Sequence, residues 1–164
     1  MQLTHIGNEA LLKLPKTAFL APSKIATLSV LRCYDWAQMM CLENRCVVSG
    51  FSSKLEKEVL HFLLKGTQPI ILTLGRKMYS KLPEELKLPL EQGRLLIVSI
   101  TNEVRQSRQN AYRRNCYIAE LAEEVVFPCI PSEDSSLYSI YDTLLKGKKT
   151  TNILYNTDHE SKSN

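Results

Sequence analysis

Short apolar runs of β type alternate with longer helical patterns along almost the whole chain, and this alternation constrains the fold more than any other feature. The expected strands are 17–21, 46–51, 70–75, 94–100, 124–130 and 151–155. They are continuous apolar runs, which is typical of strands that are covered on both faces. Strands in strict alternation with helices favour a parallel sheet between two helical layers. The sequence therefore predicts an α/β fold with a mostly parallel sheet of about six strands.

Helical patterns occupy the segments between these runs. Ser23 is the expected N-cap of the first helix, and Leu28 and Leu31 are expected to widen its buried face. Gly66 has the position of a residue that closes the second helix. A later helix is expected from about Asn110 to Glu124, so that arginines stand at its start and carboxylates at its end. A helix dipole prefers the reverse order, which raises the question of a negative ligand at that start.

Composition narrows the class of protein. The length of 164 residues indicates one domain, and the formal net charge of +4 permits an anionic partner without requiring one. The five cysteines form no C-x-x-C pair and lie near no histidine, so we expect buried thiols in a reducing compartment and no metal. Lys13 and Lys16 interrupt the apolar run near the N-terminus, and no window is long enough to span a bilayer. We expect a cytoplasmic protein without a cofactor.

Several familiar motifs are absent. "KGKKTT" (146–151) lacks the earlier glycine of a phosphate-binding P-loop, and it follows a helix instead of preceding one. The sequence contains no G-x-G-x-x-G and no G-x-S-x-G. Ser49 precedes Gly50 at the end of a strand, but the sequence supplies no base that would activate it. These observations favour binding over catalysis.

Arginines gather in one segment. Arg105, Arg108, Arg113 and Arg114 fall within ten residues that include the loop after the fourth expected strand and the start of the next helix. Arginine side chains near the free amides of a helix start form a site for phosphate. The alternative is a solvated basic face. Residue type alone does not distinguish a phosphate site from such a face.

The stretch "RRNCYIAELAEEVVF" (113–127) resembles the "RRNRIIAGLSDAVVV" signature of the DNA-processing protein A family, DprA or Smf. "VVSGFSSKLEKEVL" (47–60) is similar to the family's "VVSGLARGIDAAAH", and further segments match in order over about residues 17–155. Where the family has glycine in the loop after the first strand this chain has Pro22, although Lys24 keeps the positive charge. The resemblance implies a Rossmann-like three-layer domain at residues 17–156, preceded by an N-terminal extension (1–16) and followed by a flexible tail (157–164).

The resemblance also implies a function. It predicts binding of single-stranded DNA, without catalysis and with handover to a recombinase, and a homodimer is a further expectation. The alternative within the same superfamily is a small-molecule nucleotide derivative. Either ligand is expected in a cleft at the carboxyl ends of the strands. The predicted binding residues are Lys24, Ser49, Gly50, Arg105, Arg108, Arg113, Arg114, Asn115, Ser135 and Ser136.

Overall fold

Seven strands form a single sheet in the structure, a computed structural model that describes residues 2–155. The tail expected at 157–164 lies outside the described residues. The strands are β1 (Thr4–Gly7), β2 (Lys16–Phe19), β3 (Cys46–Ser49), β4 (Ile70–Leu74), β5 (Leu95–Ser99), β6 (Glu124–Phe127) and β7 (Thr150–Ile153). The helices are the 3-10 turn η1 (Glu9–Lys13), α1 (Thr27–Leu42), α2 (Lys54–Leu64), α3 (Glu84–Glu91), α4 (Arg108–Leu121) and α5 (Leu137–Lys146).

The sheet has the order β1-β5-β4-β3-β2-β6-β7. The six strands β2 to β7 are the expected ones, and all of them run parallel. The prediction of an α/β, mostly parallel sheet is therefore confirmed. β1 lies in the segment that we set apart as an extension. It pairs antiparallel with β5, from Thr4 opposite Ser99 to Gly7 opposite Leu96.

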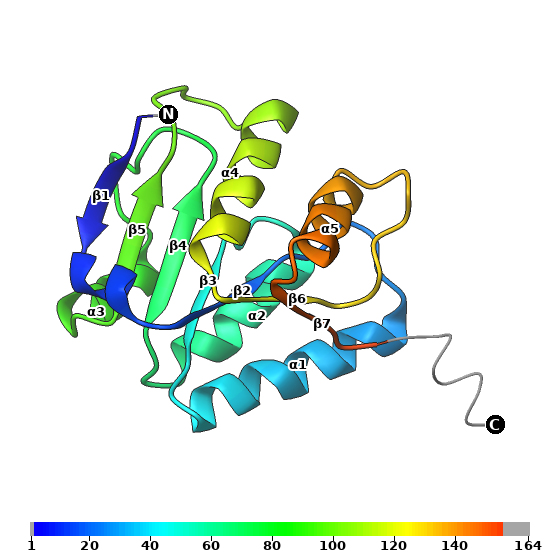
Figure 1. The fold of residues 1–164 in the computed structure, drawn as a ribbon. Helices are drawn as coiled ribbons and strands as arrows, with labels where there is room; N and C mark the ends of the chain where they lie inside the picture. Colours follow the sequence, from blue (N-terminus) through cyan, green and yellow to red (C-terminus); the bar gives the residue numbers. More distant parts are fainter. Residues whose placement is uncertain (1, 156–164) are drawn as a thin grey trace.

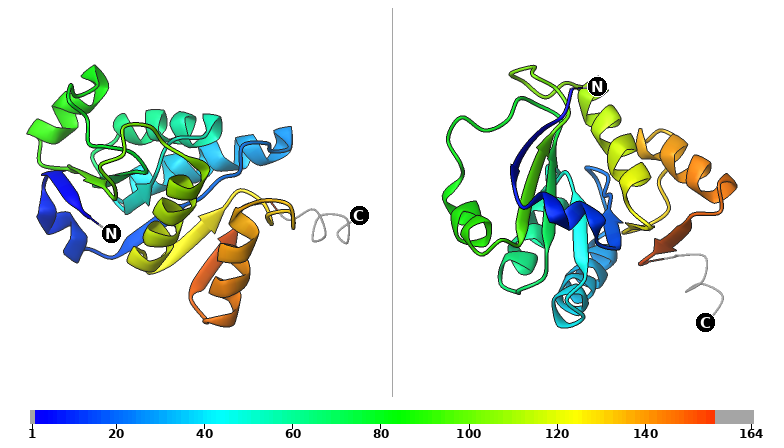
Figure 2. Two further views of the ribbon diagram at one scale, coloured as in Figure 1. Left: turned by 90° about the horizontal axis from the view of Figure 1, so that it is seen from above. Right: turned by 60° about the vertical axis from the view of Figure 1, so that its left-hand side comes forward.

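Helices cover both faces of the sheet, as a buried parallel sheet requires. α1 and α2 lie on one face, and α4 and α5 lie on the other (Figures 1 and 2). Successive residues of β4 show the division, because Ile70 and Leu72 belong to the core under α1 and α2, whereas Ile71 belongs to the core under α4 and α5. The result is the three-layer, Rossmann-like arrangement that the resemblance implied.

The start of α1 differs from the sequence prediction. Its N-cap is Ala26, so the expectation that Ser23 caps the helix was wrong. Leu28 and Leu31, expected on the buried face, are 60% and 61% exposed. Cys33 and Ala37, which the helical pattern also placed on the buried face, are buried, so the error is confined to the widening of that face by Leu28 and Leu31.

The start of α4 differs as well. Ser107 is its N-cap, and the Ser107 hydroxyl accepts a hydrogen bond of 3.0 Å from the amide of Asn110. Arg113, Arg114 and Asn115 therefore lie in the second turn of the helix and not at its start, which corrects our expectation. The helix ends at Leu121, and Glu124 belongs to β6. Glu123 and Glu124 thus lie outside the helix, whereas Arg108, Arg113 and Arg114 remain in it, so part of the adverse charge order that the sequence suggested is present in α4.

The strand order reverses between β2 and β6. From β2 the chain adds β3, β4 and β5 on one side of the sheet, and it then returns through α4 to place β6 and β7 on the other. In open parallel sheets the loops that leave two such strands diverge, and ligands bind in the crevice between them. The loops concerned are 20–26 and 128–136.

Candidate functional site

A cleft of about 600 Å³ opens where the strand order reverses between β2 and β6. We call it the switch-point cleft. Half of the predicted binding residues line it, namely Lys24, Arg108, Asn115, Ser135 and Ser136. They come from three segments that are far apart in sequence, the loop after β2, the first two turns of α4 and the loop before α5.

Local structure places each of these segments. Arg108 is the first residue of α4, directly after the Ser107 cap. Ser136 has the N-cap position of α5, but it makes no side-chain cap hydrogen bond. The Ser135 hydroxyl instead accepts a hydrogen bond of 3.1 Å from the amide of Leu137. The N-terminal end of a 10-residue helix thus borders the cleft and adds partial positive charge to it.

The charges around the cleft favour an anion. Lys24 and Arg108 are both exposed, and neither makes an ion pair with another residue of the described range 2–155. Asp134 is the carboxylate in the cleft lining, so two cations face one anion. Serine hydroxyls complete a lining that can donate hydrogen bonds to phosphate oxygens.

Gly50 and Arg114 line a neighbouring cleft of about 500 Å³, which we call the Gly50 cleft. Its other cations are Lys57 and Arg76, and Glu85 supplies a carboxylate. Its apolar lining consists of Phe51, Leu60, Leu72, Leu74, Pro83 and Leu86. The structure therefore divides the predicted site into two clefts at the same edge of the sheet.

Arg114 lines the Gly50 cleft and not the switch-point cleft, and the residue is only 3% exposed. Its Nε and Nη2 donate to Asn115 Oδ1 at 3.2 Å and 3.1 Å, and its Nη1 donates to Gln106 Oε1 at 2.8 Å. Burial lowers the pKa of Arg114, and the nearby Glu56 carboxylate opposes that shift. Arg114 stays protonated, because an arginine pKa starts too high for burial to neutralise it.

Glu56 is a site residue that our sequence analysis missed. It is buried at the start of α2, where its Oε1 accepts from the amides of Ser52 and Ser53 and its Oε2 accepts from the amide of Ala21. Ser53 caps the same helix and forms a capping box with Glu56. The free amides at this helix start are therefore occupied by a carboxylate of the chain itself. The S-x-x-E spacing at 53–56 was the signal for it.

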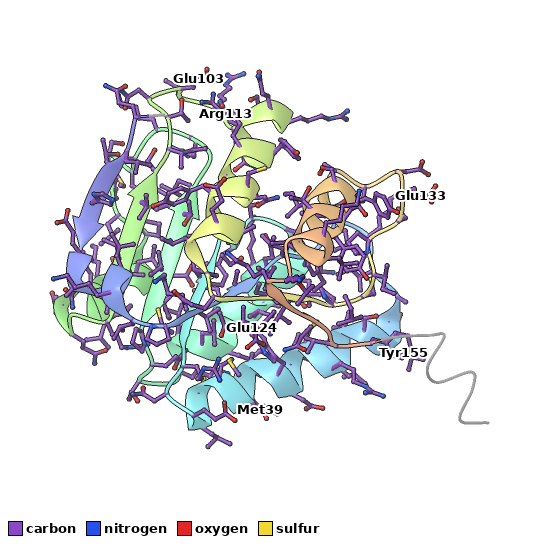
Figure 3. The ribbon with its side chains drawn as sticks, viewed as in Figure 1. Met39, Glu103, Arg113, Glu124, Glu133 and Tyr155 are labelled. Carbon is purple, nitrogen blue, oxygen red and sulfur yellow. The ribbon has the colours of Figure 1, made fainter. Side chains whose placement is uncertain are left out.

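Three predicted residues lie in neither cleft. Ser49 is fully buried, and its hydroxyl accepts a hydrogen bond of 3.2 Å from the amide of Phe51. Arg105 and Arg113 are exposed and do not line either cleft. Figure 3 shows Arg113 on the N-terminal half of α4, close to the loop that contains Glu103. The two arginines thus extend the basic surface beyond the switch-point cleft.

Within residues 2–155 the chain offers neither a cluster of metal ligands nor a helix that could span a membrane. No group of three or more His, Cys, Asp or Glu side chains lies where it could hold a metal ion. No helix within residues 2–155 has the length and apolar character needed to cross a membrane.

The sequence matches no protein-family model and no curated protein. The fold, in contrast, is similar to solved structures. DNA processing protein A from Helicobacter pylori, described as binding single-stranded DNA, has a TM-score of 0.72 at 18% identity over 91% of this chain and 69% of that one. DprA from Streptococcus pneumoniae has a TM-score of 0.69 at 21% identity over 88% of this chain and 52% of that one. This chain thus spans about half the length of the pneumococcal protein.

A second group of solved structures has the same fold. The molybdenum cofactor binding protein from Rippkaea orientalis has a TM-score of 0.61 at 14% identity, over 92% of this chain and 81% of that one. Sequence identities this low show a shared architecture, but they do not show a shared ligand or activity. The similarity to DprA that the sequence suggested is therefore established for the fold, which DprA shares with proteins that bind a different ligand.

Proposed function

We propose that the switch-point cleft binds phosphate groups of single-stranded DNA, and that the chain acts as a binding protein without catalysis. The observation that supports this most strongly is the convergence of Lys24, Arg108 and Asn115 on one cleft from separate segments. Two cations without described ion pairs, an amide side chain and a helix N-terminus together form a surface of hydrogen-bond donors. Such a surface complements the acceptor oxygens of phosphate.

Exposed arginines next to the cleft favour a polymer over a single phosphate. Arg105 and Arg113 project from the loop before α4 and from α4 itself, outside both clefts. Along a nucleic-acid strand, successive phosphates meet successive cations and supply the sequence-independent part of the affinity. The Helicobacter pylori neighbour, whose fold is similar, is described as binding single-stranded DNA.

A free nucleotide is the second candidate, and one observation favours it. Stacking on aromatic side chains contributes much of the affinity for single strands. The switch-point cleft has no aromatic residue among its described lining. The aromatic candidates Tyr79 and Tyr112 lie elsewhere, Tyr79 in the Gly50 cleft and Tyr112 beside Ser139, to which its hydroxyl is hydrogen-bonded at 3.1 Å.

Fluorescence anisotropy with a labelled oligothymidylate, measured over a range of salt concentrations, tests the proposal. We expect the Lys24→Ala, Arg108→Ala double variant to bind at least tenfold more weakly. Each lost phosphate contact should reduce the slope of log K against log salt by about 0.7. The matched control removes two exposed lysines that line neither cleft, Lys13→Ala with Lys81→Ala.

Equal affinity of both double variants would reject the switch-point cleft as the binding site. Competition separates the two ligands. If thymidine monophosphate binds as tightly as the oligonucleotide, displacing half of it at a concentration close to the Kd of the oligonucleotide, and the salt slope is near that of one contact, the ligand is a nucleotide. If displacement requires a large excess of the monophosphate, the ligand is the strand.

A further inference from the structure

We infer that Arg114 is a positioning residue, which rests against Gly50 and turns the side-chain amide of Asn115 so that its NH₂ group faces the switch-point cleft. This inference rests on the proposed function, and it assigns to the buried arginine a role without direct ligand contact. The chain of contacts runs from the end of β3 through α4 to the cleft.

Gly50 permits the first contact. A Cβ built on this residue would stand 2.6 Å from both Cζ and Nε of Arg114 and 3.0 Å from its Cδ. Real Cβ atoms essentially never approach other atoms to 2.6 Å, and the guanidinium is held by three hydrogen bonds, so it cannot simply swing away. The absence of a side chain at position 50 therefore leaves the space that the Arg114 guanidinium occupies.

Arg114 in turn determines the orientation of Asn115. The guanidinium carries only donors, so the atom of Asn115 that meets its Nε and Nη2 is the amide oxygen Oδ1. The identity of this atom as oxygen and not nitrogen therefore follows from hydrogen-bond chemistry, because the two atoms of a side-chain amide are hard to distinguish by position alone. The Nδ2 of Asn115 consequently points away from Arg114, and within residues 2–155 it has no hydrogen-bond acceptor.

Asn115 lines the switch-point cleft, so two N–H donors are available at a fixed place beside Lys24 and Arg108. The reversed amide would present its oxygen to the cleft and repel a phosphate oxygen, which accepts hydrogen bonds and does not donate them. Arg114 excludes that orientation. The buried guanidinium thereby contributes to binding although Arg114 does not line the switch-point cleft.

An isosteric variant separates this role from a structural one. In Asn115→Asp a carboxylate oxygen still accepts both hydrogen bonds from Arg114, so the thermal midpoint should be equal to that of the unmodified chain or higher. The cleft, however, loses both donors and gains a negative charge. We expect oligothymidylate to bind at least tenfold more weakly. Unchanged affinity would overturn the assignment of Asn115.

Arg114→Lys tests the orienting contact itself. Lysine keeps the charge but cannot form the paired hydrogen bonds to one amide oxygen. In ¹⁵N-labelled protein titrated with inorganic phosphate, we expect the side-chain NH₂ resonances of Asn115 to shift in the unmodified chain and to shift little in this variant. Gly50→Ala should have the same effect. Shifts of equal size in all three proteins would show that Arg114 does not position the amide.

The two proposals fail differently. If Lys24→Ala with Arg108→Ala abolishes binding while Arg114→Lys and Gly50→Ala bind normally, the proposed function stands and the positioning role is wrong. If the unmodified chain binds neither oligothymidylate nor phosphate, both are wrong. Loss of binding in Arg114→Lys together with loss of the folded ¹⁵N spectrum would identify the arginine as a structural residue and also overturn the inference.

Discussion

Glu56 Oε2 accepts a hydrogen bond of 3.0 Å from the amide of Ala21, a residue 35 positions away in the sequence. This bond joins the start of α2 to the loop that leaves β2, and Ala21 itself lines the switch-point cleft. One buried carboxylate thus holds together two of the loops at the carboxyl end of the sheet.

Replacing Glu56 by alanine should be strongly destabilising. The amides of Ala21, Ser52 and Ser53 would lose their acceptor, and each buried donor left unpaired costs about 1–3 kcal/mol. We expect a loss of roughly 3–5 kcal/mol in the free energy of unfolding, measured by urea denaturation. Ser53→Ala, which removes only the cap of the same helix, should cost about 1 kcal/mol. Equal losses in the two variants would contradict this role of Glu56.

The stability of the chain should fall in acid partly through Glu123. Burial acts to raise the pKa of this carboxyl, but the amide of Lys16, its own amide and the Lys16 ammonium at 3.5 Å together lower it below its ordinary value of 4.5. A lowered pKa in the folded state stabilises the fold above pH 4.5, and this contribution is lost as the pH falls through the folded value.

Urea denaturation at pH 7 and pH 3 tests this pair. Glu123→Gln should be less stable than the unmodified chain at pH 7, and the difference should disappear at pH 3. The difference will be modest, since the Glu123 side chain is 58% exposed. Glu91→Gln, which removes an exposed carboxylate without a described ion pair, should show no such pH dependence. A constant deficit of Glu123→Gln at both pH values would exclude the ion pair as its cause.

The thiols of Cys33 and Cys46 should be inert in the folded protein. Burial raises the pKa of each to about 12, so at pH 8 almost none of either thiol is the reactive thiolate. We expect iodoacetamide to leave both unmodified at pH 8 in buffer and to alkylate both in urea, as read by peptide mass spectrometry. Alkylation of Cys33 at similar rates in the two conditions would show that the α1 side of the core opens readily.

Leu28 and Leu31 should contribute little to stability, although the sequence suggested a buried position for both. Each is about 60% exposed, and surface substitutions usually change the free energy of unfolding by less than about 0.5 kcal/mol. We expect a change no larger than this in the free energy of unfolding of Leu28→Gln and of Leu31→Gln. Leu63→Ala on α2, at a fully buried position, should cost about 2–5 kcal/mol. A loss above 1 kcal/mol in Leu28→Gln would show that α1 packs differently.

The main architecture was predictable because it depends on burial from both sides. A strand such as β4, covered on each face, is buried at every position, and "IILTL" is apolar at all of them except Thr73, a pattern that is visible without reference to its neighbours. β1 was missed for the opposite reason. Its four residues, THIG, lie at the sheet edge and are nowhere fully buried, so no apolar run marks the strand.

The division of the site was not predictable in the same way. Arg114 and Asn115 are adjacent, and a linear motif gives no sign that they line different clefts. The direction of each side chain depends on the helix turn in which it lies, and that turn was misplaced because Ser107 caps α4 earlier than we expected. Ser107 lies three residues before Asn110, and its hydroxyl accepts a hydrogen bond from the Asn110 amide. A serine at this spacing was the local signal for the true start of α4.

The antiparallel β1 adds a seventh strand to the sheet, and the number of strands determines the distance between the two edges. β1 and β7 are the outermost strands on opposite sides, as Figure 1 shows, so six strand-to-strand spacings of about 4.8 Å separate them, roughly 29 Å in all. That separation is well suited to resonance energy transfer between dyes attached beside the two strands. The transfer efficiency would report on the whole width of the sheet at once, and it would fall if either edge strand detached.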